Sequence, residues 1–456
     1  MHSALVRHVI FPLHERLRGR RTLAYLAEME RTQWLSPDAL QALQWRKLTR
    51  LLTHATRTVP YYRDLFRRIG AAPGDIRTLA DFQRLPVLTR DLVRDNLDAL
   101  RSTRPPAPLL DSCTGGSSGQ PLRFSSDVVK EARGNAAKLR ARRWWGLDIG
   151  DKELDIWGNP VELSRAGKVR DWKDRALNLR AVSAYDLSRP ALSRWVRVLE
   201  TYRPKFLYVY PSALAELCRF LQAEGIDPAA WAPRYVISTA ESLPGPDREL
   251  IERTLGARVV LEYGAHDGAP VMAHDCPCGR MHTLDDLALL EVTRHGRPVG
   301  VHELGELLVT SLDGYGMPFI RYAIGDLARL DDSRCTLGRG FGALEALEGR
   351  VAELLYREDG SAQSGLYLTG FFRTVPGVRQ FQVVQRGPSR FVARLVVAGD
   401  FERAWETKIE SFMRAGLGPS ISVTCEYVEA IAPSPSGKVR WVINEWATTA
   451  ASSLSR

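Results

Sequence analysis

Long hydrophobic runs are missing from this chain of 456 residues. No run of about 18 consecutive apolar residues occurs, which argues against a transmembrane helix and against insertion into a membrane. The first residues, 1–7, hold no apolar core followed by a cleavage site, so we expect no secretory signal. These absences predict a cytoplasmic protein, and its length predicts two or three domains.

Cysteine is also scarce, because six residues cannot form a disulfide framework for a chain of this length. The cysteines are therefore expected to be reduced thiols or metal ligands. No motif of nucleic-acid recognition accompanies the net charge of +10, which argues against a nucleic-acid-binding protein. The charge indicates either solvated arginine-rich faces or an anionic partner, such as a nucleotide, coenzyme A or an acidic carrier protein.

What the sequence does contain is a run of glycine, serine and threonine at 114–119, placed between Leu109-Leu110 and an expected strand at 121–124. Such a run exposes backbone N–H groups and hydroxyls, which can surround phosphate oxygens. No Gly-Lys-Ser/Thr sequence ends it, so it is not a Walker loop. A flexible turn is the alternative interpretation of the run.

The pattern of apolar residues predicts an α/β protein with a large N-terminal domain at 1–348 and a small α+β lid at 349–456. Residues 1–100 show helical spacing. Strands then alternate with helices, which predicts parallel sheets with right-handed crossovers and a ligand site at the carboxyl ends of the strands. The expected strands are 154–157, 206–210, 235–239 and 259–263, and the expected helices are 128–145 and 213–224. Glycines at 338, 340, 342 and 349 suggest a linker, and the last ten residues suggest disorder.

Several motifs, taken in order, resemble those of the phenylacetate–CoA ligase-like branch of the adenylate-forming superfamily. Runs at 59–63 and 85–90 resemble the opening of those enzymes. The further matches are the phosphate loop Thr114-Gly115-Gly116-Ser117-Ser118-Gly119, Ala240-Glu241, Tyr263-Gly264-Ala265-His266-Asp267, Arg321-Tyr322-Ala323-Ile324-Gly325-Asp326, Gly349-Arg350 and Ser436-Gly437-Lys438. Each motif is weak alone, but six in order make a chance match improbable.

The resemblance implies ATP, Mg²⁺ and a thiol acceptor, and it assigns roles to the matching residues. Lys438 would neutralise the repulsion between a carboxylate and the α-phosphate of ATP, and its alternative is an exposed lysine in a turn. Asp267 stands at the Mg²⁺-ligand position, where the family usually has the longer Glu. His266 replaces the usual Ser or Thr, and it either bonds the α-phosphate or lies at the rim.

Three further residues match the family's nucleotide pocket. Asp326 would accept both ribose hydroxyls, and Arg350 would pair with Asp326 or a phosphate. Tyr263 would stack on adenine. The alternatives are a turn aspartate, a structural hinge arginine and plain packing of a tyrosine at a strand end.

Aromatic and hydroxyl side chains around two strand ends suggest the acyl pocket. The residues are Tyr208, Tyr210, Ser212, Ser238 and Thr239. Aromatic walls suit an aryl acid, although tyrosine is also common in buried strands.

A cysteine and histidine cluster remains outside these motifs. Cys276, Cys278 and His282 have the spacing of zinc ligands, and Cys335 supplies a fourth if the chain returns, with His274 as a substitute. Some members of the family hold zinc between the corresponding segments, so we expect a structural Zn²⁺. A loop with incidental thiols is the alternative.

The sequence thus predicts an ATP-dependent acid–thiol ligase that acts on a small carboxylic acid. Its acceptor is coenzyme A or the phosphopantetheine of an acyl carrier protein, and we expect a homodimer. Basic residues on the helix at 128–145 are expected to attract that acceptor, and a solvated helix face is the alternative; they are Arg133, Arg140, Arg142 and Arg143. The alternative function is a divergent relative that binds nucleotide or an acyl group without ligation.

Overall fold

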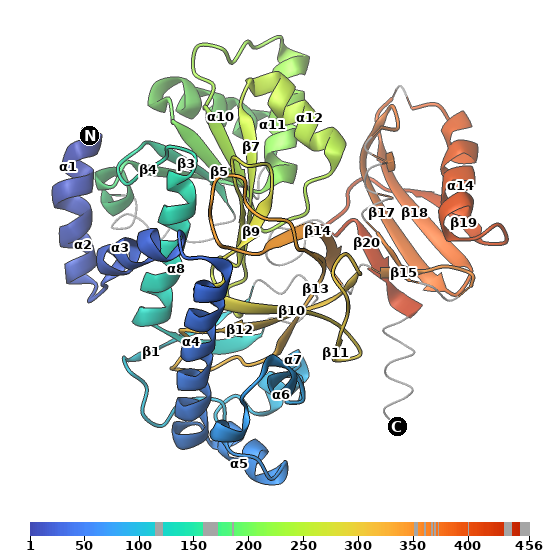
Figure 1. Ribbon diagram of the computed structural model, residues 1–456. Coiled ribbons are helices and arrows are strands. Elements are labelled where there is room, and N and C mark those ends of the chain that lie inside the picture. The colour runs from blue at the N-terminus through green and yellow to red at the C-terminus, as the bar shows by residue number, and fades with distance from the viewer. Residues whose placement is uncertain are drawn as a thin grey trace.

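The computed structural model describes residues 1–114, 122–157, 172–184, 187–350, 354–359, 362–365, 368, 371–372, 374–399, 401–432 and 440–446. It is a mixed α/β structure in which a large body precedes a small C-terminal sheet (Figure 1). Within the described part of the chain, no helix is both long and apolar enough to cross a membrane.

The N-terminal region is helical, as its apolar spacing predicts. Its elements are α1 (Ser3–Leu5), a π-helical turn (Val6–Ile10), α2 (Phe11–Leu17), α3 (Thr22–Thr32), α4 (Pro37–Thr58), α5 (Pro60–Arg68), a 3₁₀ turn (Pro73–Asp75), α6 (Leu79–Gln83) and α7 (Arg90–Asp95). Helix α4 begins with a Ser36 side chain that accepts from the backbone of Ala39, followed by a proline in the first turn. Thr89 caps α7 by accepting from the N–H of Leu92.

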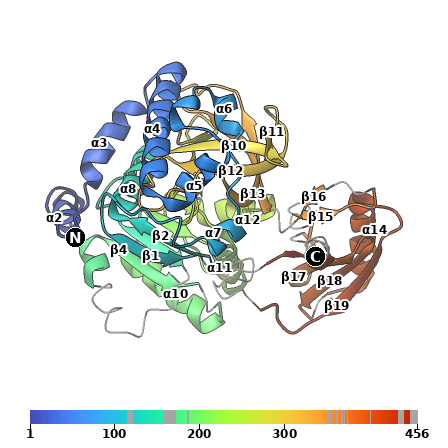
Figure 2. The ribbon, with the colours of Figure 1, turned by 90° about the horizontal axis from the view of Figure 1, so that it is seen from below.

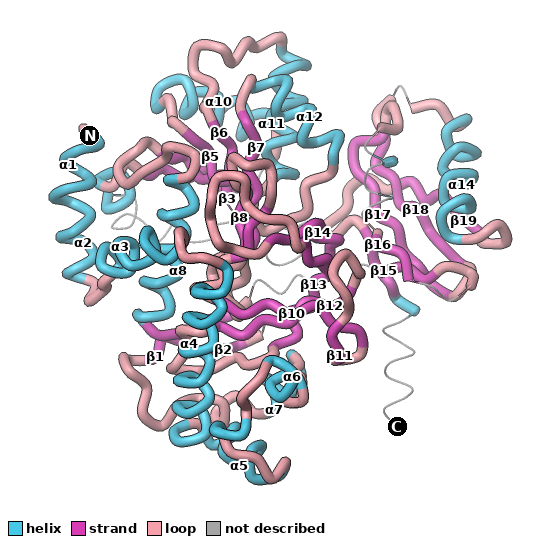
Figure 3. The backbone as a smooth tube through the Cα atoms, in the orientation of Figure 1, coloured by secondary structure: helices cyan, strands magenta, loops and turns pink. Residues whose placement is uncertain are grey.

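A parallel half-sheet positions the predicted motifs. Its strands are β3 (Glu153–Trp157), β4 (Leu179–Ser183), β5 (Phe206–Val209), β6 (Tyr235–Ser238) and β7 (Arg258–Tyr263), in the order β7-β6-β5-β3-β4. All neighbouring pairs within this set are parallel. The accompanying helices are α8 (Val128–Arg143), α10 (Arg189–Tyr202), α11 (Pro211–Glu224) and α12 (Gly245–Leu255), and the views show them flanking the strands (Figure 3).

The same sheet continues through β7 into antiparallel strands, which gives it twelve strands in all. The antiparallel strands are β8 (Ala273–Asp275), β9 (Met281–Thr283), β10 (Ala288–Arg294), β11 (Arg297–Pro298), β12 (Gly305–Ser311), β13 (Tyr322–Asp331) and β14 (Ala343–Arg350). A separate pair, β1 (Leu109–Cys113) and β2 (Arg123–Asp127), brackets the glycine-rich run.

The prediction of a linker at the crowded glycines is wrong. Residues 343–350 form strand β14, which pairs with both β13 and β9. Gly342 lies just before this strand, where a Cβ would come within 2.9 Å of the Thr283 hydroxyl, and Gly349 lies inside it with a positive φ of 86°. Close packing and a local bend therefore explain these two glycines.

The C-terminal unit has its own sheet and core. Strands β17 (Val378–Gly387), β18 (Arg390–Val397), β19 (Ser422–Tyr427) and β20 (Val442–Asn444) form a four-stranded sheet in the order β19-β18-β17-β20, with α14 (Ala404–Leu417) packed on it. A short hairpin of β15 (Leu354–Tyr356) and β16 (Ala362–Ser364) precedes it. Seen from below, this unit lies to one side of the large body (Figure 2). The boundary at 348/349 stays a prediction.

Candidate active site

Two predicted loops follow the carboxyl ends of neighbouring parallel strands. Ala240, two residues beyond β6, adopts a positive φ of 67°, which turns the chain sharply. The next side chain, Glu241, accepts hydrogen bonds from the backbone N–H and the hydroxyl of Ser212 at 3.3 and 2.6 Å. Ser212 lies in the first turn of α11, so this contact ties the loop after β6 to the helix after β5.

Tyr263 and Asp326 are brought together from positions 63 residues apart. Tyr263 ends β7, and its hydroxyl donates to Oδ2 of Asp326 at 2.7 Å. Asp326 lies on β13 directly opposite Arg350 of β14 in the strand register, so the backbone places three predicted nucleotide residues together. Gly264 follows Tyr263 where a Cβ would stand 2.1 Å from the carbonyl of Pro270, so only glycine fits there.

Asp267 is deeply buried, with 4% of its surface exposed. Its Oδ2 accepts from the Tyr322 hydroxyl at 2.8 Å and lies 3.8 Å from the Arg90 guanidinium. Arg90 also donates to the Thr114 hydroxyl at 3.2 Å, and that hydroxyl accepts from the N–H of Leu122 at 2.9 Å. These contacts join the two ends of the glycine-rich run to the Asp267 loop.

Lys130 of α8 lies beneath the same loop and was missed by sequence reasoning. Its buried ammonium donates to the backbone carbonyl of Asp267 at 3.2 Å and lies near the rings of Phe124 and Phe319. Burial lowers the pKa of Lys130 to about 8, against the opposing charges of Asp267 and Asp127.

His266 packs edge-on against Phe124, with ring centroids 5.7 Å apart. Burial, followed by the nearby charge of Lys130, lowers the pKa of His266 below its ordinary value. The imidazole is therefore neutral at physiological pH, and it can offer one N–H donor to an anion but not a full positive charge.

The predicted acyl-pocket tyrosines line up with a tryptophan that sequence reasoning did not assign to the site. Trp157, at the end of β3, stacks on Tyr208 with centroids 5.3 Å apart and packs on Tyr210 at 4.2 Å. Ser238 and Thr239 are buried at the end of β6. Among the described residues, the Ser238 hydroxyl has no hydrogen-bond partner.

A charged network lies under this aromatic group, between α8 and the parallel strands. The Tyr208 hydroxyl donates to Glu262 at 2.9 Å, and Lys138 lies 3.4 Å from the same carboxylate and 3.8 Å from the centre of the Tyr208 ring. Burial alone would raise the pKa of Glu262, but Lys138 and Arg142 hold it below its usual value. Burial raises the pKa of Asp155 well above its usual range. No local sequence signal predicts this network, because its members come from four separate elements that only the fold brings together.

The cysteine cluster converges as predicted. Ligand atoms of Cys276, Cys278, His282 and Cys335 all lie within 4.8 Å of one another. The Nδ1–H of His282 donates to the carbonyl of Gly342 at 2.9 Å, which leaves Nε2 facing the Cys278 sulfur at 3.3 Å. The substitute His274 lies outside the cluster, with its Nε2 3.9 Å from a Glu262 oxygen.

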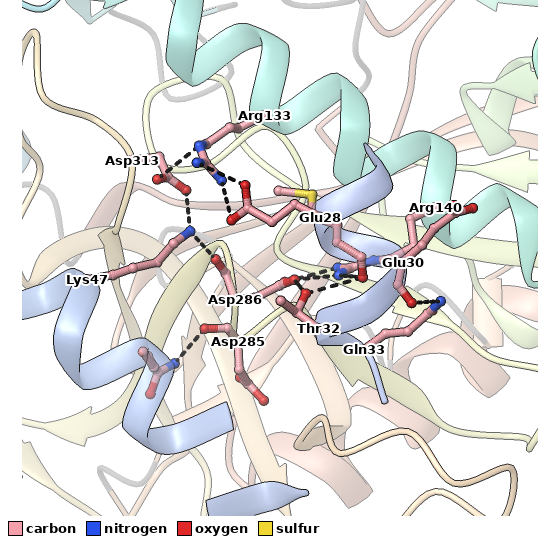
Figure 4. A network of polar contacts seen from close by, with 12 residues as sticks. Glu28, Glu30, Thr32, Gln33, Lys47, Arg133, Arg140, Asp285, Asp286 and Asp313 are labelled. Atoms are coloured by element: carbon pink, nitrogen blue, oxygen red, sulfur yellow. Dashed lines mark hydrogen bonds and ion pairs between the residues drawn. The ribbon is translucent and has the colours of Figure 1, made fainter. Parts of the chain in front are cut away.

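The prediction that four arginines of α8 attract an acceptor is wrong. Arg140 is fully buried and forms a two-point contact with Asp286 at 2.5 and 3.1 Å, as Figure 4 shows. Arg142 makes the same kind of contact with Glu153 at 2.7 and 2.9 Å. Arg133 pairs with Glu28 and Asp313, and Arg143 pairs with Glu30 and Asp148. The helix turns this face toward α3 and the sheet, so the charges are neutralised internally.

Several predicted residues lie outside the part of the chain that the structure describes. These are Gly115, Gly116, Ser117, Ser118 and Gly119 of the phosphate loop, and Lys438 with its neighbours Ser436 and Gly437. For Arg350 only the backbone is described.

The chain is similar in sequence to several known proteins. The CapK C-terminal domain family matches residues 355–445. "Protein CapK" of Staphylococcus aureus is 23% identical over 433 residues, 94% of each chain. The phenylacetate-coenzyme A ligase of Escherichia coli K12 is 29% identical over 309 residues, which are 65% of this chain and 68% of the ligase.

Solved structures show the same fold over nearly the whole chain. 2-Hydroxyisobutyryl-CoA ligase, in the postadenylation state with R3-HIB-AMP, matches with a TM-score of 0.73 at 19% identity, covering 93% of this chain and 94% of the ligase. In its thioesterfication state, with 2-HIB-AMP and CoA, the ligase matches with a TM-score of 0.60 at 19% identity over 93% of each chain. The chain has the fold of the adenylate-forming enzymes. Within that class, its sequence resembles those of the phenylacetate-coenzyme A ligases.

Proposed function

We propose that this protein is an AMP-forming acid–thiol ligase. A carboxylate oxygen of the substrate attacks the α-phosphorus of ATP, and pyrophosphate leaves. The thiolate sulfur of the acceptor then attacks the carbonyl carbon of the acyl-adenylate, and AMP leaves. The observation that carries the proposal is the contact between Tyr263 and Asp326 beside the loop of Asp267, at the carboxyl end of the parallel strands.

In this proposal, described and undescribed residues together would form the nucleotide site. The Tyr263 ring stacks on adenine while its hydroxyl orients the Asp326 carboxylate, which accepts the ribose hydroxyls. The glycine-rich run 114–119, held at its base by Thr114, would surround the phosphates with N–H donors. Lys438 would stabilise the negative charge that develops as the carboxylate attacks.

Asp267 is our candidate ligand for Mg²⁺. Its Oδ2 already accepts from Tyr322, and the second carboxylate oxygen is the donor that suits a hard cation. A bound Mg²⁺ would neutralise phosphate charge. The neutral His266 next to Asp267 would donate a hydrogen bond to the α-phosphate.

The aromatic residues of the predicted acyl pocket favour an aryl acid as the substrate. The stacked rings of Trp157, Tyr208 and Tyr210 form an aromatic wall beside the loop that carries Glu241. Coenzyme A is the acceptor that the ligase relatives favour. The phosphopantetheine of a carrier protein remains a candidate acceptor, and ATP and coenzyme A are both available in the cytoplasm, where we place the protein.

The four-residue cluster fits a structural zinc site. Three thiols and one imidazole form the Cys₃His donor set of closed tetrahedral sites, and the Gly342 carbonyl fixes the tautomer of His282. The metal would join the β8–β9 turn to the segment around Cys335, and it would take no part in the reaction.

A second candidate function comes from the CapK matches. CapK aligns with 94% of this chain, whereas the curated ligases align with 65–73%, and the matching domain family covers the C-terminal sheet. A relative that binds a nucleotide or an acyl group without ligating it would keep the Tyr263–Asp326 contact. Such a relative would not need Lys438, because no carboxylate attacks the α-phosphate.

Pyrophosphate release separates the two candidates. The protein is incubated with ATP, Mg²⁺ and panels of aryl and fatty acids, first without an acceptor and then with coenzyme A or a holo-carrier protein. The ligase proposal expects acid-dependent pyrophosphate release, and Asp326→Asn should raise the KM for ATP with little change for the acid. ATP binding without pyrophosphate release across the panel, with an active control ligase, would favour the non-ligating candidate.

A further inference from the structure

The outer face of the N-terminal helical segment carries a regular line of exposed apolar side chains. Its members are Met1, Leu5, Val9, Leu13 and Leu17, with exposed fractions of 54, 47, 54, 54 and 79%. We call these five residues the N-terminal stripe. Each lies four residues after the one before, and α1, the π-helical turn and α2 follow one another without a gap. The segment lies at the edge of the large body, away from the C-terminal sheet (Figure 1).

The π-helical turn helps to keep this line straight. In an α-helix of 3.6 residues per turn, a step of four residues rotates the side chain by about 40°. Four such steps would carry the line almost halfway around the helix. The turn at Val6–Ile10 has i→i+5 hydrogen bonds and therefore more residues per turn, which rotates the line back.

The opposite face of the segment is firmly attached to the protein. Val6 is fully buried, and Arg7 donates to the carbonyl of Ile149 at 3.3 Å and pairs with Asp148 at 3.4 Å. The helix backbone lies so close to the body that a Cβ on Gly150 would stand 2.5 Å from the Ser3 carbonyl. The exposed stripe is therefore the outward face of a docked helix.

Within residues 1–21, the exposed charged side chains have one sign. Residues 1–21 contain five arginines and a single acid, Glu15, which is buried and bonded to Thr22 and His14. Arg16, Arg18 and Arg21 are exposed, and the described part of the chain gives them no acidic partner. Trp172 is 75% exposed, and the next residue, Lys173, pairs with Asp174.

We propose that this helix binds the surface of an anionic lipid bilayer, lying in the plane of the headgroups with the stripe buried. An apolar line with a basic border is the pattern of interfacial helices, and an exposed tryptophan suits the same boundary. Pairing of two copies through the stripe is disfavoured, because it would bring Arg16, Arg18 and Arg21 of both copies together, and residues 1–21 hold no exposed acid to oppose them. The inference is independent of the proposed ligase chemistry.

Co-sedimentation of the full-length protein with vesicles tests this inference. We expect binding to vesicles of phosphatidylcholine mixed with phosphatidylglycerol, and much weaker binding to phosphatidylcholine alone. Val9→Glu and Leu13→Glu should each lower the partition coefficient by about tenfold, the factor that corresponds to burial of one aliphatic side chain. Arg18→Glu should lower it by at least about fivefold, and the loss should shrink in high salt.

Val301→Glu is the matched control, because Val301 is a similarly exposed valine (45%) far from the segment in sequence. It should leave vesicle binding unchanged, and circular dichroism should show that all variants are folded. Equal sedimentation with neutral and anionic vesicles, or unchanged binding in the Val9 and Leu13 variants, overturns the proposal. So does light scattering that shows a dimer which Leu13→Glu converts to a monomer, together with no binding to anionic vesicles.

Discussion

Replacing Lys130 by methionine should change how the stability of this protein depends on pH. The ammonium is buried under the Asp267 loop, and its pKa falls to about 8 in the folded protein from 10.5 in the exposed group. Between these two values the unfolded chain holds the proton and the folded protein releases it. Raising the pH through this interval therefore stabilises the wild-type protein through this one group.

The size of the effect follows from the two pKa values. Linkage gives a contribution of about −3 kcal/mol near pH 7.5 and about −1.4 kcal/mol near pH 9.5, so the wild type should gain roughly 2 kcal/mol across that range. Methionine has a similar length and no proton to release, so Lys130→Met should lack this gain. The variant also loses the hydrogen bond to the Asp267 carbonyl, which lowers its stability by about 1 kcal/mol at any pH.

Urea unfolding at several pH values measures this difference. Subtracting the curve of the variant from that of the wild type removes the other titrating groups, provided that the two proteins have the same m-value. A second readout is the pKa of His266 by NMR, which should rise in the variant because the charge of Lys130 lowers it. Parallel stability curves between pH 7.5 and 9.5, with an unmoved His266, would refute the buried and titrating lysine.

Three other changes have definite expected outcomes. Lys438→Ala should slow adenylate formation by roughly two to three orders of magnitude, the scale of one lost charge stabiliser, while thioester formation from supplied acyl-adenylate continues; equal loss in both half-reactions would reject this division of labour. Zinc should copurify at about one ion per chain, and Cys276→Ser should abolish it and lower the Tm; plasma emission analysis showing far less metal in wild type prepared without chelators would favour incidental thiols. Arg140→Leu should cost about 3–5 kcal/mol of unfolding free energy because Asp286 keeps a buried charge, and a loss below 1 kcal/mol would contradict the described pairing.

The sequence alone was enough to predict four of the five strands of the parallel half-sheet, β4 being the exception, and two of its four helices. Strands β5, β6 and β7 and helices α8 and α11 stand within two residues of their predicted positions, because continuous apolar runs and helical spacing are local signals. The same locality explains why the convergence of Cys276, Cys278 and His282 could be predicted. Two cysteines and a histidine within seven residues constrain one another through the chain itself.

Only the tertiary structure decided which charged side chains are free to bind a partner and which are paired inside the protein. Arg133, Arg140 and Arg143 of α8 lie three or seven residues apart, and this spacing shows that they share much of one face but not what that face meets. The fold turns it toward α3 and the loop of Asp286, more than 140 residues away, so the expected acceptor surface is an internal salt-bridge network. Likewise, Lys130 and Trp157 join the site only through contacts that span the sheet.

The glycines near 340 show that local sequence also leaves the backbone conformation undecided. Glycine permits both a flexible connection and a close approach between packed strands, and the choice depends on what lies next to it. Here Thr283 stands against Gly342 and β13 pairs with β14, so the chain is ordered where its composition suggested a linker. Local sequence thus determined the elements and the short-range clusters, while the environment of each side chain depended on partners distant in the chain, which only the folded structure brings into contact.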